Sequence, residues 1–170
     1  IDFKSFIDHA RSIMAQGVDG VVVGGTTGEG HVLSVMEKKR LIDAAMAISS
    51  GMSAGKKFQV IAGTGTRDIR EAIEISRYAE KAGCAAVLAL PPNSNDQISV
   101  RKFYEKLGSA TPGITLFAYN IPGLTKVNVT PETVGALVRS GHIDGVKDSG
   151  QNPDLMLEWK RVNPETFFIV

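Results

Sequence analysis

The sequence predicts an α/β fold in which parallel strands alternate with helices. Strand-like segments begin near residues 21, 59, 85, 115, 145 and 167. Their spacing of about 22 to 39 residues is the size of one strand with its crossover helix. The segments are mostly continuous apolar runs, which indicates a sheet covered on both faces. Two architectures fit these observations: an open doubly wound sheet, and a portion of a (β/α)₈ TIM barrel.

Each predicted element has a local signal. Gly17 and Gly83 end the first and third helices, Ser34 with Glu37 forms a capping box for the second, and Pro131 takes the first position of the fifth. The strands are short aliphatic runs bounded by Gly or Pro. In chain order, the elements are a helix over residues 2–16, a strand over 20–25, a helix over 35–50, a strand over 58–63, a helix over 66–82, a strand over 85–92, a helix over 99–108, a strand over 114–122, a helix from 131, a strand over 145–148, a helix over 153–161 and a strand from 166.

Composition excludes several classes of protein. The 170 residues hold 19 Lys and Arg against 18 Asp and Glu, a formal charge of +1, so no strong field draws the chain to nucleic acid. Cys84 is the single cysteine, which excludes an intrachain disulfide framework. No apolar run is long enough to span a bilayer. We therefore expect a cytoplasmic protein without a nucleic-acid or membrane partner.

The length fits one domain. A complete barrel needs roughly 250 residues, so in the barrel interpretation residues 1–170 are a single TIM-barrel domain that is incomplete at both ends. The chain opens inside a helical pattern and ends inside the strand-like segment TFFIV, 166–170, and both observations favour that interpretation.

Unusual residues gather where four of the predicted strands end. They are GGTTGEG at 24–30, LPPNSND at 90–96, YNIP at 119–122 and KDSG at 147–150. In both architectures, functional residues collect at the carboxyl ends of parallel strands. Residues from several separate ends face one mouth when the strands form a ring, which favours the barrel.

Lys147 lies on a strand of about four residues, where a valine is the usual occupant. It points opposite to Val146, which in a barrel is toward the interior. Burial favours a neutral amine over an ammonium group, and a neutral amine can condense with a ketone to form a Schiff base. The alternative is a strand-end lysine that reaches solvent or pairs with Asp148.

Tyr119 belongs to the preceding strand. It is in phase with Phe117 and opposite Ala118, so it shares the inward face and can approach Lys147 from the next strand. A phenol in that place can carry a proton to or from a reacting carbon or hydroxyl. The alternative is a core tyrosine bonded to a backbone carbonyl.

The segment GGTTGEG combines flexible glycines with two hydroxyls. Loop amides together with Thr hydroxyls can bind a carboxylate without a full positive charge, although an ordinary tight turn uses the same residues. The segment lacks the ending of a Walker A loop and does not match G-x-G-x-x-G. His9, His31 and His142 lack the spacing of metal ligands. We therefore expect no metal and no bound nucleotide, and three surface or structural histidines.

In this order and spacing, GGTTGE, IAGTGT, YNIP and GVKDSG resemble the dihydrodipicolinate synthase/N-acetylneuraminate lyase family of pyruvate-dependent class I aldolases. The similarity runs over essentially the whole chain, and the pairing of YNIP with the lysine is its most specific part. The resemblance implies a (β/α)₈ barrel, of which this chain holds about strands two to seven. It also implies a small-molecule substrate, a homo-oligomer that is commonly a tetramer, and no cofactor.

The resemblance assigns roles to individual residues. It implies that Lys147 forms an imine with pyruvate or another 2-oxo acid, that Tyr119 shuttles protons and that Thr26 is its relay partner. Thr27 and the neighbouring amides would hold the pyruvate carboxylate. The resemblance also implies that Gly25 and Gly28 of that loop bind substrate.

Two positions depart from the family pattern. Pro92 and Asn93 stand where the family usually has a pair of tyrosines, one of which is lent across a subunit interface to the proton relay. Leu124 stands two residues after the proline of YNIP, where the synthases carry an arginine that binds the carboxylate of the aldehyde substrate. A leucine cannot form such a bidentate contact.

These departures favour one function over two alternatives. The first choice is a metal-independent Schiff-base aldolase, a carbon–carbon lyase, that reversibly cleaves a hydroxylated 2-oxo acid, such as a 2-keto-3-deoxy sugar acid, to pyruvate and an aldehyde. The second is 4-hydroxy-tetrahydrodipicolinate synthase, which condenses pyruvate with aspartate semialdehyde in lysine biosynthesis. The third, from another class, is a non-catalytic 2-oxo acid binder or an inactive fragment.

Overall fold

The computed structural model describes residues 1–51 and 58–169. One sheet contains six parallel strands in the order β1-β2-β3-β4-β5-β6. The strands are β1 Gly20–Val23, β2 Gln59–Gly63, β3 Ala86–Ala89, β4 Thr115–Asn120, β5 Gly145–Asp148 and β6 Phe167–Ile169. Doubly wound sheets reverse their strand order at a switch point. Because each strand here pairs with the next one in the chain, the topology is that of a (β/α)₈ barrel.

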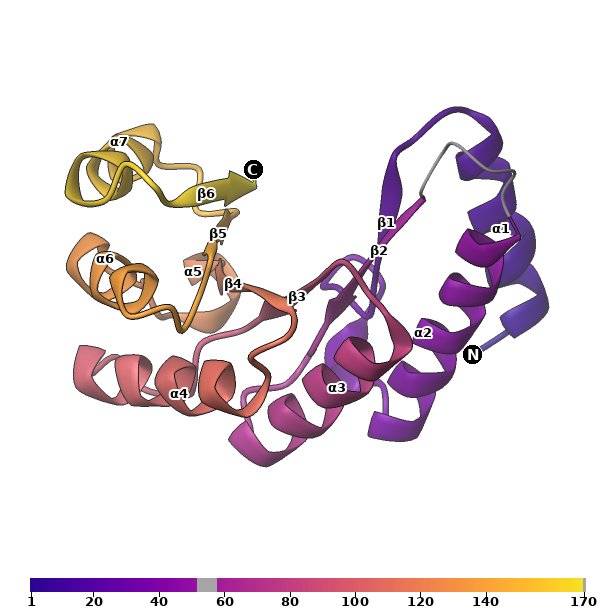
Figure 1. The fold of residues 1–170 in the computed structure, drawn as a ribbon, viewed down its shortest axis with the longest axis horizontal. Coiled ribbons are helices and arrows are strands. Elements are labelled where there is room, and N and C mark those ends of the chain that lie inside the picture. The colour runs from indigo at the N-terminus through magenta and orange to yellow at the C-terminus, as the bar shows by residue number, and fades with distance from the viewer. Residues whose placement is uncertain (52–57, 170) are drawn as a thin grey trace.

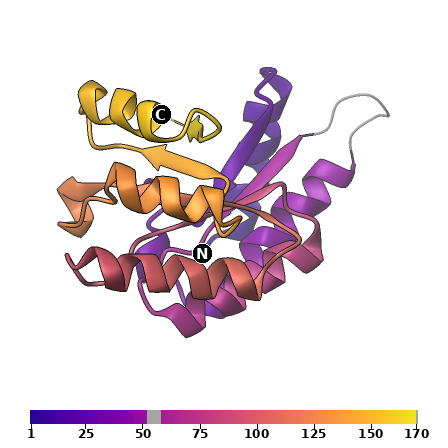
Figure 2. The ribbon, with the colours of Figure 1, turned by 60° about the vertical axis from the view of Figure 1, so that its left-hand side comes forward.

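The helices lie along the outer side of the curved sheet, as Figures 1 and 2 show. The helices are α1 Phe3–Ala15, α2 Val35–Ser50, α3 Ile69–Ala82, α4 Gln97–Ala110, α5 Pro122–Thr125, α6 Pro131–Arg139 and α7 Pro153–Val162, with a short 3₁₀ helix η1 Gly30–Val32. In Figure 1, β1 and β6 stand at opposite ends of the arc, and the two strands do not pair in the described part of the chain. The structure is therefore part of a barrel wall.

The sheet has two apolar faces. The outer face packs against the helices in a large core that includes Ala118 and Val146, both fully buried. The inner face carries a small second cluster of Ala86, Leu88 and Phe117. Each large aliphatic side chain buried in the outer core contributes roughly 1.5–3 kcal/mol to stability. The alternation along β4 and β5 confirms the prediction that Tyr119 and Lys147 share the face opposite Ala118 and Val146.

The inner face is less covered than the continuous apolar strands led us to expect. Val22 on β1 is 48% exposed and Phe167 on β6 is 68% exposed. Both belong to the edge strands of the arc, where a closed barrel would place further strands against them. The outer face is covered by helices, as expected. The inner face is covered only at its centre.

Most element boundaries agree with the sequence. Ser34 and Glu37 form the predicted capping box, and Thr130 caps α6. Helix α4 begins two residues earlier than predicted because the carboxylate of Asp96 accepts hydrogen bonds from the backbone amides of Ile98 and Ser99. Two short elements, η1 and α5, were not predicted, and Val170 of the last predicted strand lies outside the described residues.

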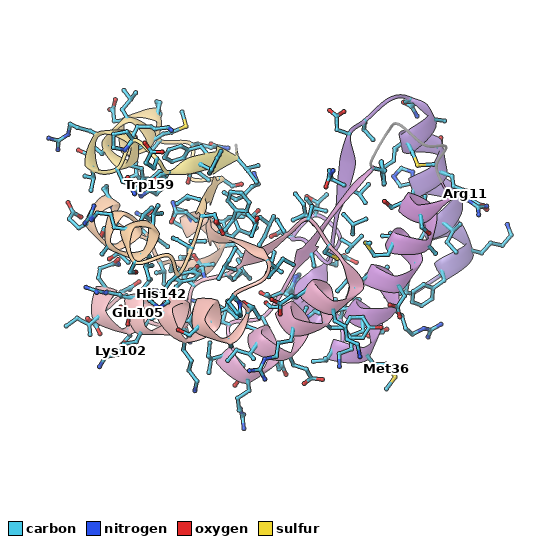
Figure 3. The ribbon with its side chains drawn as sticks, in the orientation of Figure 1. Arg11, Met36, Lys102, Glu105, His142 and Trp159 are labelled. Carbon is cyan, nitrogen blue, oxygen red and sulfur yellow. The ribbon has the colours of Figure 1, made fainter. Side chains whose placement is uncertain are left out.

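The side chains of the helices divide clearly between solvent and the outer core. In Figure 3, Arg11, Met36 and Lys102 project away from the body of the molecule, and all three are exposed. Trp159 of α7 is instead fully buried, and its indole Nε1 donates to the carbonyl of Val129 at 3.2 Å. Within residues 1–51 and 58–169, no helix has both the length and the hydrophobicity needed to cross a membrane.

Candidate active site

Lys147 and Tyr119 lie side by side at the carboxyl ends of neighbouring strands. They are direct partners in the parallel register of β4 and β5. The Lys147 Nζ atom is 5.7 Å from the centroid of the Tyr119 ring, within the range of a cation–π contact. Both side chains are partly buried on the inner face, so Lys147 is less enclosed than a complete barrel interior would make it.

The neighbouring carboxylate does not pair with this lysine. Asp148 points to the outer face, where its Oδ1 accepts hydrogen bonds from Asn120 Nδ2 at 2.9 Å and from the Gly150 amide at 3.0 Å. Lys147 Nζ instead donates to the hydroxyl of Ser149 at 3.3 Å. The alternative in which Lys147 pairs with Asp148 is therefore wrong.

The loop after β1 is tightly folded. Gly24 has a positive φ of 66°, and a side chain at Gly30 would overlap the carbonyl oxygen of Gly24. The Gly30 amide donates to the Gly25 carbonyl at 3.0 Å, which closes the turn. Glycine is required at these two positions because of a left-handed backbone and a close backbone approach.

The tight turn brings Thr26 to Tyr119. The Thr26 hydroxyl lies 3.5 Å from the Tyr119 hydroxyl, at the long limit of a hydrogen bond, although 93 residues separate the two in the chain. The curvature of the arc therefore brings the ends of β1 and β4 together. A closed ring, which we expected this convergence to need, is not necessary.

A hollow opens beside this pair. Its lining residues are Gly24, Gly25, Thr26, His31, Gly63, Gly65, Leu88, Leu90, Tyr119 and Leu124. Four residues predicted for the site thus share one cavity wall. Thr27 and Gly28 are exposed and do not line the hollow, and Lys147 lies on the other side of Tyr119.

His31 is a surface histidine, as one of the two expectations had it, and it also borders the site. It is exposed but lines the hollow, where it follows the glycine-rich loop. His142 matches a structural role, because its Nδ1 lies 2.7 Å from the Ser140 hydroxyl. In the part of the chain that the structure describes, no three His, Cys, Asp or Glu side chains cluster in a way that could hold a metal ion.

The two departures from the family pattern have clear structural settings. Arg67 donates from Nε to the Pro91 carbonyl at 3.0 Å and from Nη2 to the Pro92 carbonyl at 2.7 Å. An arginine from the neighbouring unit therefore holds the loop in which the tyrosine pair is absent. Leu124 is 51% exposed and presents an apolar side chain to the hollow.

Sequence reasoning missed Ser149 and Arg67. Ser149 was discoverable, because it is two residues after Lys147 and side chains in a strand alternate with a period of two. Arg67 carried no comparable signal, since its partners are backbone carbonyls that any residues could supply. The arrangement as a whole joins an amine, a phenol and two hydroxyls at one end of the sheet.

Comparisons with known proteins show which family this chain resembles. The model of the dihydrodipicolinate synthetase family matches residues 1–170. A 4-hydroxy-tetrahydrodipicolinate synthase from Desulfotalea psychrophila is 33% identical over 172 residues, covering 100% of this chain and 56% of that protein. One from Brucella abortus is 40% identical over 151 residues, covering 87% of this chain and 50% of that protein.

A solved structure described as KD(P)GA from T. tenax superimposes with a TM-score of 0.83 at 34% identity, covering 98% of this chain and 55% of that one. The chain thus spans about half the length of the curated relatives that it matches.

Proposed function

Because the chain belongs to the dihydrodipicolinate synthetase family, we propose that it carries the pyruvate-activating site of a Schiff-base enzyme, with Lys147 as the nucleophile. The observation that carries the proposal is the register pair of Tyr119 and Lys147, with Nζ 5.7 Å from the phenol ring and Thr26 at the phenol hydroxyl. An amine next to a relayed phenol suits imine chemistry.

In the proposed mechanism, the neutral Lys147 amine attacks the 2-oxo carbon of pyruvate, one proton is taken up from solvent, and water leaves to give an imine that is protonated on nitrogen. A proton then leaves C3, and its electron pair moves toward the imine nitrogen, so a neutral enamine forms. Tyr119 carries that proton and Thr26 is its relay partner. The enamine carbon attacks an aldehyde, and hydrolysis of the new imine releases product and frees Lys147. Cleavage of a hydroxylated 2-oxo acid is the same sequence reversed.

The carboxylate of pyruvate is assigned to the loop after β1. Gly25 lines the hollow, and the exposed Thr27 and Gly28 offer a hydroxyl and an amide at the same strand end. These groups recognise an anion without adding a second cation beside Lys147. No metal or organic cofactor enters these steps, because the imine itself withdraws the electron pair.

For the second substrate, aspartate semialdehyde is favoured. The relatives at 33% and 40% identity are both 4-hydroxy-tetrahydrodipicolinate synthases, which supports the synthase over sugar-acid cleavage, the function that the sequence favoured. Leu124 keeps sugar-acid cleavage as the second candidate, because its apolar side chain offers no bond to an aldehyde carboxylate. The similarity to KD(P)GA supports the same candidate.

Pyruvate activation can be tested without the second substrate. In D₂O, the chain should catalyse exchange of the pyruvate methyl protons, followed by ¹H NMR, because the enamine picks up deuterium at C3. Tyr119→Phe should slow this exchange by about 10²-fold or more. Exchange no faster than in buffer alone would contradict the proposed function.

The second substrate is identified by measuring both candidate reactions, condensation and cleavage, with the same preparation of the chain. A synthase forms product from pyruvate and aspartate semialdehyde, and Leu124→Arg should raise that rate by supplying a carboxylate partner. If a 2-keto-3-deoxy sugar acid is cleaved rapidly while the condensation stays at background in both forms, the lyase is the correct function.

The homo-oligomer and the single incomplete domain stay predictions, because membership of the family tests neither of them.

A further inference from the structure

Ser149 lies on the same face of the sheet as Lys147. Its backbone amide donates to the Asn120 carbonyl at 2.9 Å, which extends the ladder between β4 and β5 by one residue beyond Asp148. Since side chains alternate along a strand, residues 147 and 149 both point inward. The hydroxyl accordingly lies 3.3 Å from Lys147 Nζ.

This hydroxyl is the hydrogen-bond partner that the structure provides for the lysine nitrogen. The negative charge of a carboxylate would favour the ammonium form and would hold the nitrogen in that form. A serine hydroxyl accepts a hydrogen bond from an ammonium group and donates one to a neutral amine. Ser149 can therefore hold Nζ in one position in both of its protonation states, whereas Asp148 is occupied on the outer face by Asn120 and Gly150.

Imine formation requires a proton to move from the lysine nitrogen to the former carbonyl oxygen, two atoms that a single hydroxyl can bridge. When the amine adds to the 2-oxo carbon, the new C–N bond leaves an extra proton on nitrogen and a negative charge on the former carbonyl oxygen. That oxygen takes up two protons before it leaves as water. The first is the extra proton of the nitrogen and the second comes from solvent, so the imine forms protonated on nitrogen. Tyr119 faces Nζ with its ring, and its hydroxyl is engaged toward Thr26.

We propose that Ser149 is a catalytic residue of imine formation, which carries a proton from the Lys147 nitrogen to the departing oxygen. Its Oγ takes the N–H proton while its own O–H proton passes to the carbinolamine oxygen, so Ser149 is unchanged at the end of the step. Tyr119 and Thr26 then act on the later step at C3. The inference rests on the proposed function and divides its proton transfers between two groups.

The test compares Ser149→Thr with Ser149→Val, which have nearly the same shape and differ in the hydroxyl. Each form is mixed with pyruvate and quenched with borohydride at increasing times, and the reduced adduct at residue 147 is measured by mass spectrometry. Wild type and Ser149→Thr should form the adduct at similar rates. Ser149→Val should be slower by about 10²-fold, with the same final extent, because a catalyst changes the rate and not the equilibrium.

Methyl-proton exchange provides a readout that loss of structure would not reproduce. If the deuterium carried by the trapped adduct at residue 147 is counted in D₂O after the adduct level has reached its plateau, exchange at C3 of the bound imine in Ser149→Val should match wild type, because the C3 step belongs to Tyr119. Should Ser149→Val not fold, as judged by circular dichroism, Ser149→Ala takes its place.

Two results overturn the inference. Equal adduct rates in wild type, Ser149→Thr and Ser149→Val would leave the imine at Lys147 intact and remove Ser149 from the chemistry. Absence of an adduct in wild type would instead remove the proposed function itself, and Ser149 with it.

Discussion

Lys38 carries a charge into the outer layer, behind the candidate site. Its side chain is 3% exposed and passes close to Gly24 and Gly65, at the ends of β1 and β2. Burial lowers the pKa of the Lys38 ammonium group below its usual 10.5, and the charge of Glu71 opposes the shift. A buried cation with a lowered pKa costs stability wherever it stays protonated.

The first prediction concerns Lys38→Met. Between the lowered pKa of the folded state and the unfolded value of 10.5, the unfolded chain binds more protons, so the stability of wild type rises with pH in that window. At pH values below that window the cost is fully present, and Lys38→Met should be the more stable form there. Its advantage should shrink as the pH approaches 10.5, as measured by urea unfolding.

Lys106→Met is the matched control for that series because it removes an exposed lysine, and it should change the free energy of unfolding little. If the free energies of unfolding of Lys38→Met and wild type differ by the same amount at every pH, Lys38 has the same pKa in the folded and unfolded chains, which contradicts the prediction.

Tyr104 is the second residue whose contribution to the free energy of unfolding can be measured by a single substitution. It is fully buried on α4, and its hydroxyl donates to the Ala89 carbonyl at the end of β3 at 2.9 Å. Burial raises the pKa of this phenol, which keeps it a neutral donor. Tyr104→Phe leaves the carbonyl unpaired and should lower the free energy of unfolding by about 1–3 kcal/mol.

The control for Tyr104→Phe is Tyr78→Phe, whose hydroxyl bonds the Asp43 carboxylate at 2.7 Å at the surface. Water can replace that bond, so the loss should be smaller. Equal losses in the two variants would contradict the importance of burial at Tyr104.

At the level of elements, Asn120 ties β4 to its neighbours. Its side chain is fully buried. Its Nδ2 donates to Asp148 of β5 at 2.9 Å, and its Oδ1 accepts from the Val129 amide at 3.0 Å. One amide thus fixes the strand carrying Tyr119, the strand carrying Lys147 and the start of the segment that leads to α6.

Asn120→Ala should therefore lower stability by about 2 kcal/mol, because the Val129 amide loses its partner and the buried Asp148 carboxylate keeps the Gly150 amide but loses Asn120. Asn128→Ala, which removes an exposed partner at 3.4 Å, should change stability little. Thermal or urea unfolding of the two variants measures the contrast. Similar stability of both would mean that Asp148 and Val129 find other partners.

The sequence predicts elements best where a side chain signals the boundary. Ser34 with Glu37 and the glycine at residue 83 mark helix ends through local hydrogen bonds and local backbone angles. The short helix α5 was missed because Pro122 at its first position also fits a simple strand end. Elements of three or four residues lack the periodic pattern on which prediction depends.

At the level of the whole molecule, strand order decides between the two architectures that the sequence left open. Periodicity gives each strand and helix but contains no information on sheet curvature or on which strand pairs with which. The inward direction of Tyr119 and Lys147 follows from alternation alone. Their contact with Thr26 does not, because it depends on how far the arc bends between β1 and β4.

The arc also explains which parts of the site were misjudged. Lys147 was expected to be buried, but with β6 as its outer neighbour at the edge of the arc it is partly open. Thr27 and Gly28 were expected beside the substrate, but they lie on the outer part of the loop. Position along a motif does not determine which of its residues turn inward.

The central claim is that Lys147, and no other lysine, forms an imine with pyruvate. The direct measurement is borohydride reduction of the chain with pyruvate, followed by peptide mass mapping of wild type, Lys147→Met and Lys126→Met. Lys126 is a suitable control because it is exposed at the same end of the sheet, where its Nζ donates to the Gly123 carbonyl at 2.9 Å.

The account predicts a reduced pyruvate adduct on residue 147 in wild type and in Lys126→Met, and none in Lys147→Met. An adduct spread over several surface lysines, or one that survives in Lys147→Met, would contradict it.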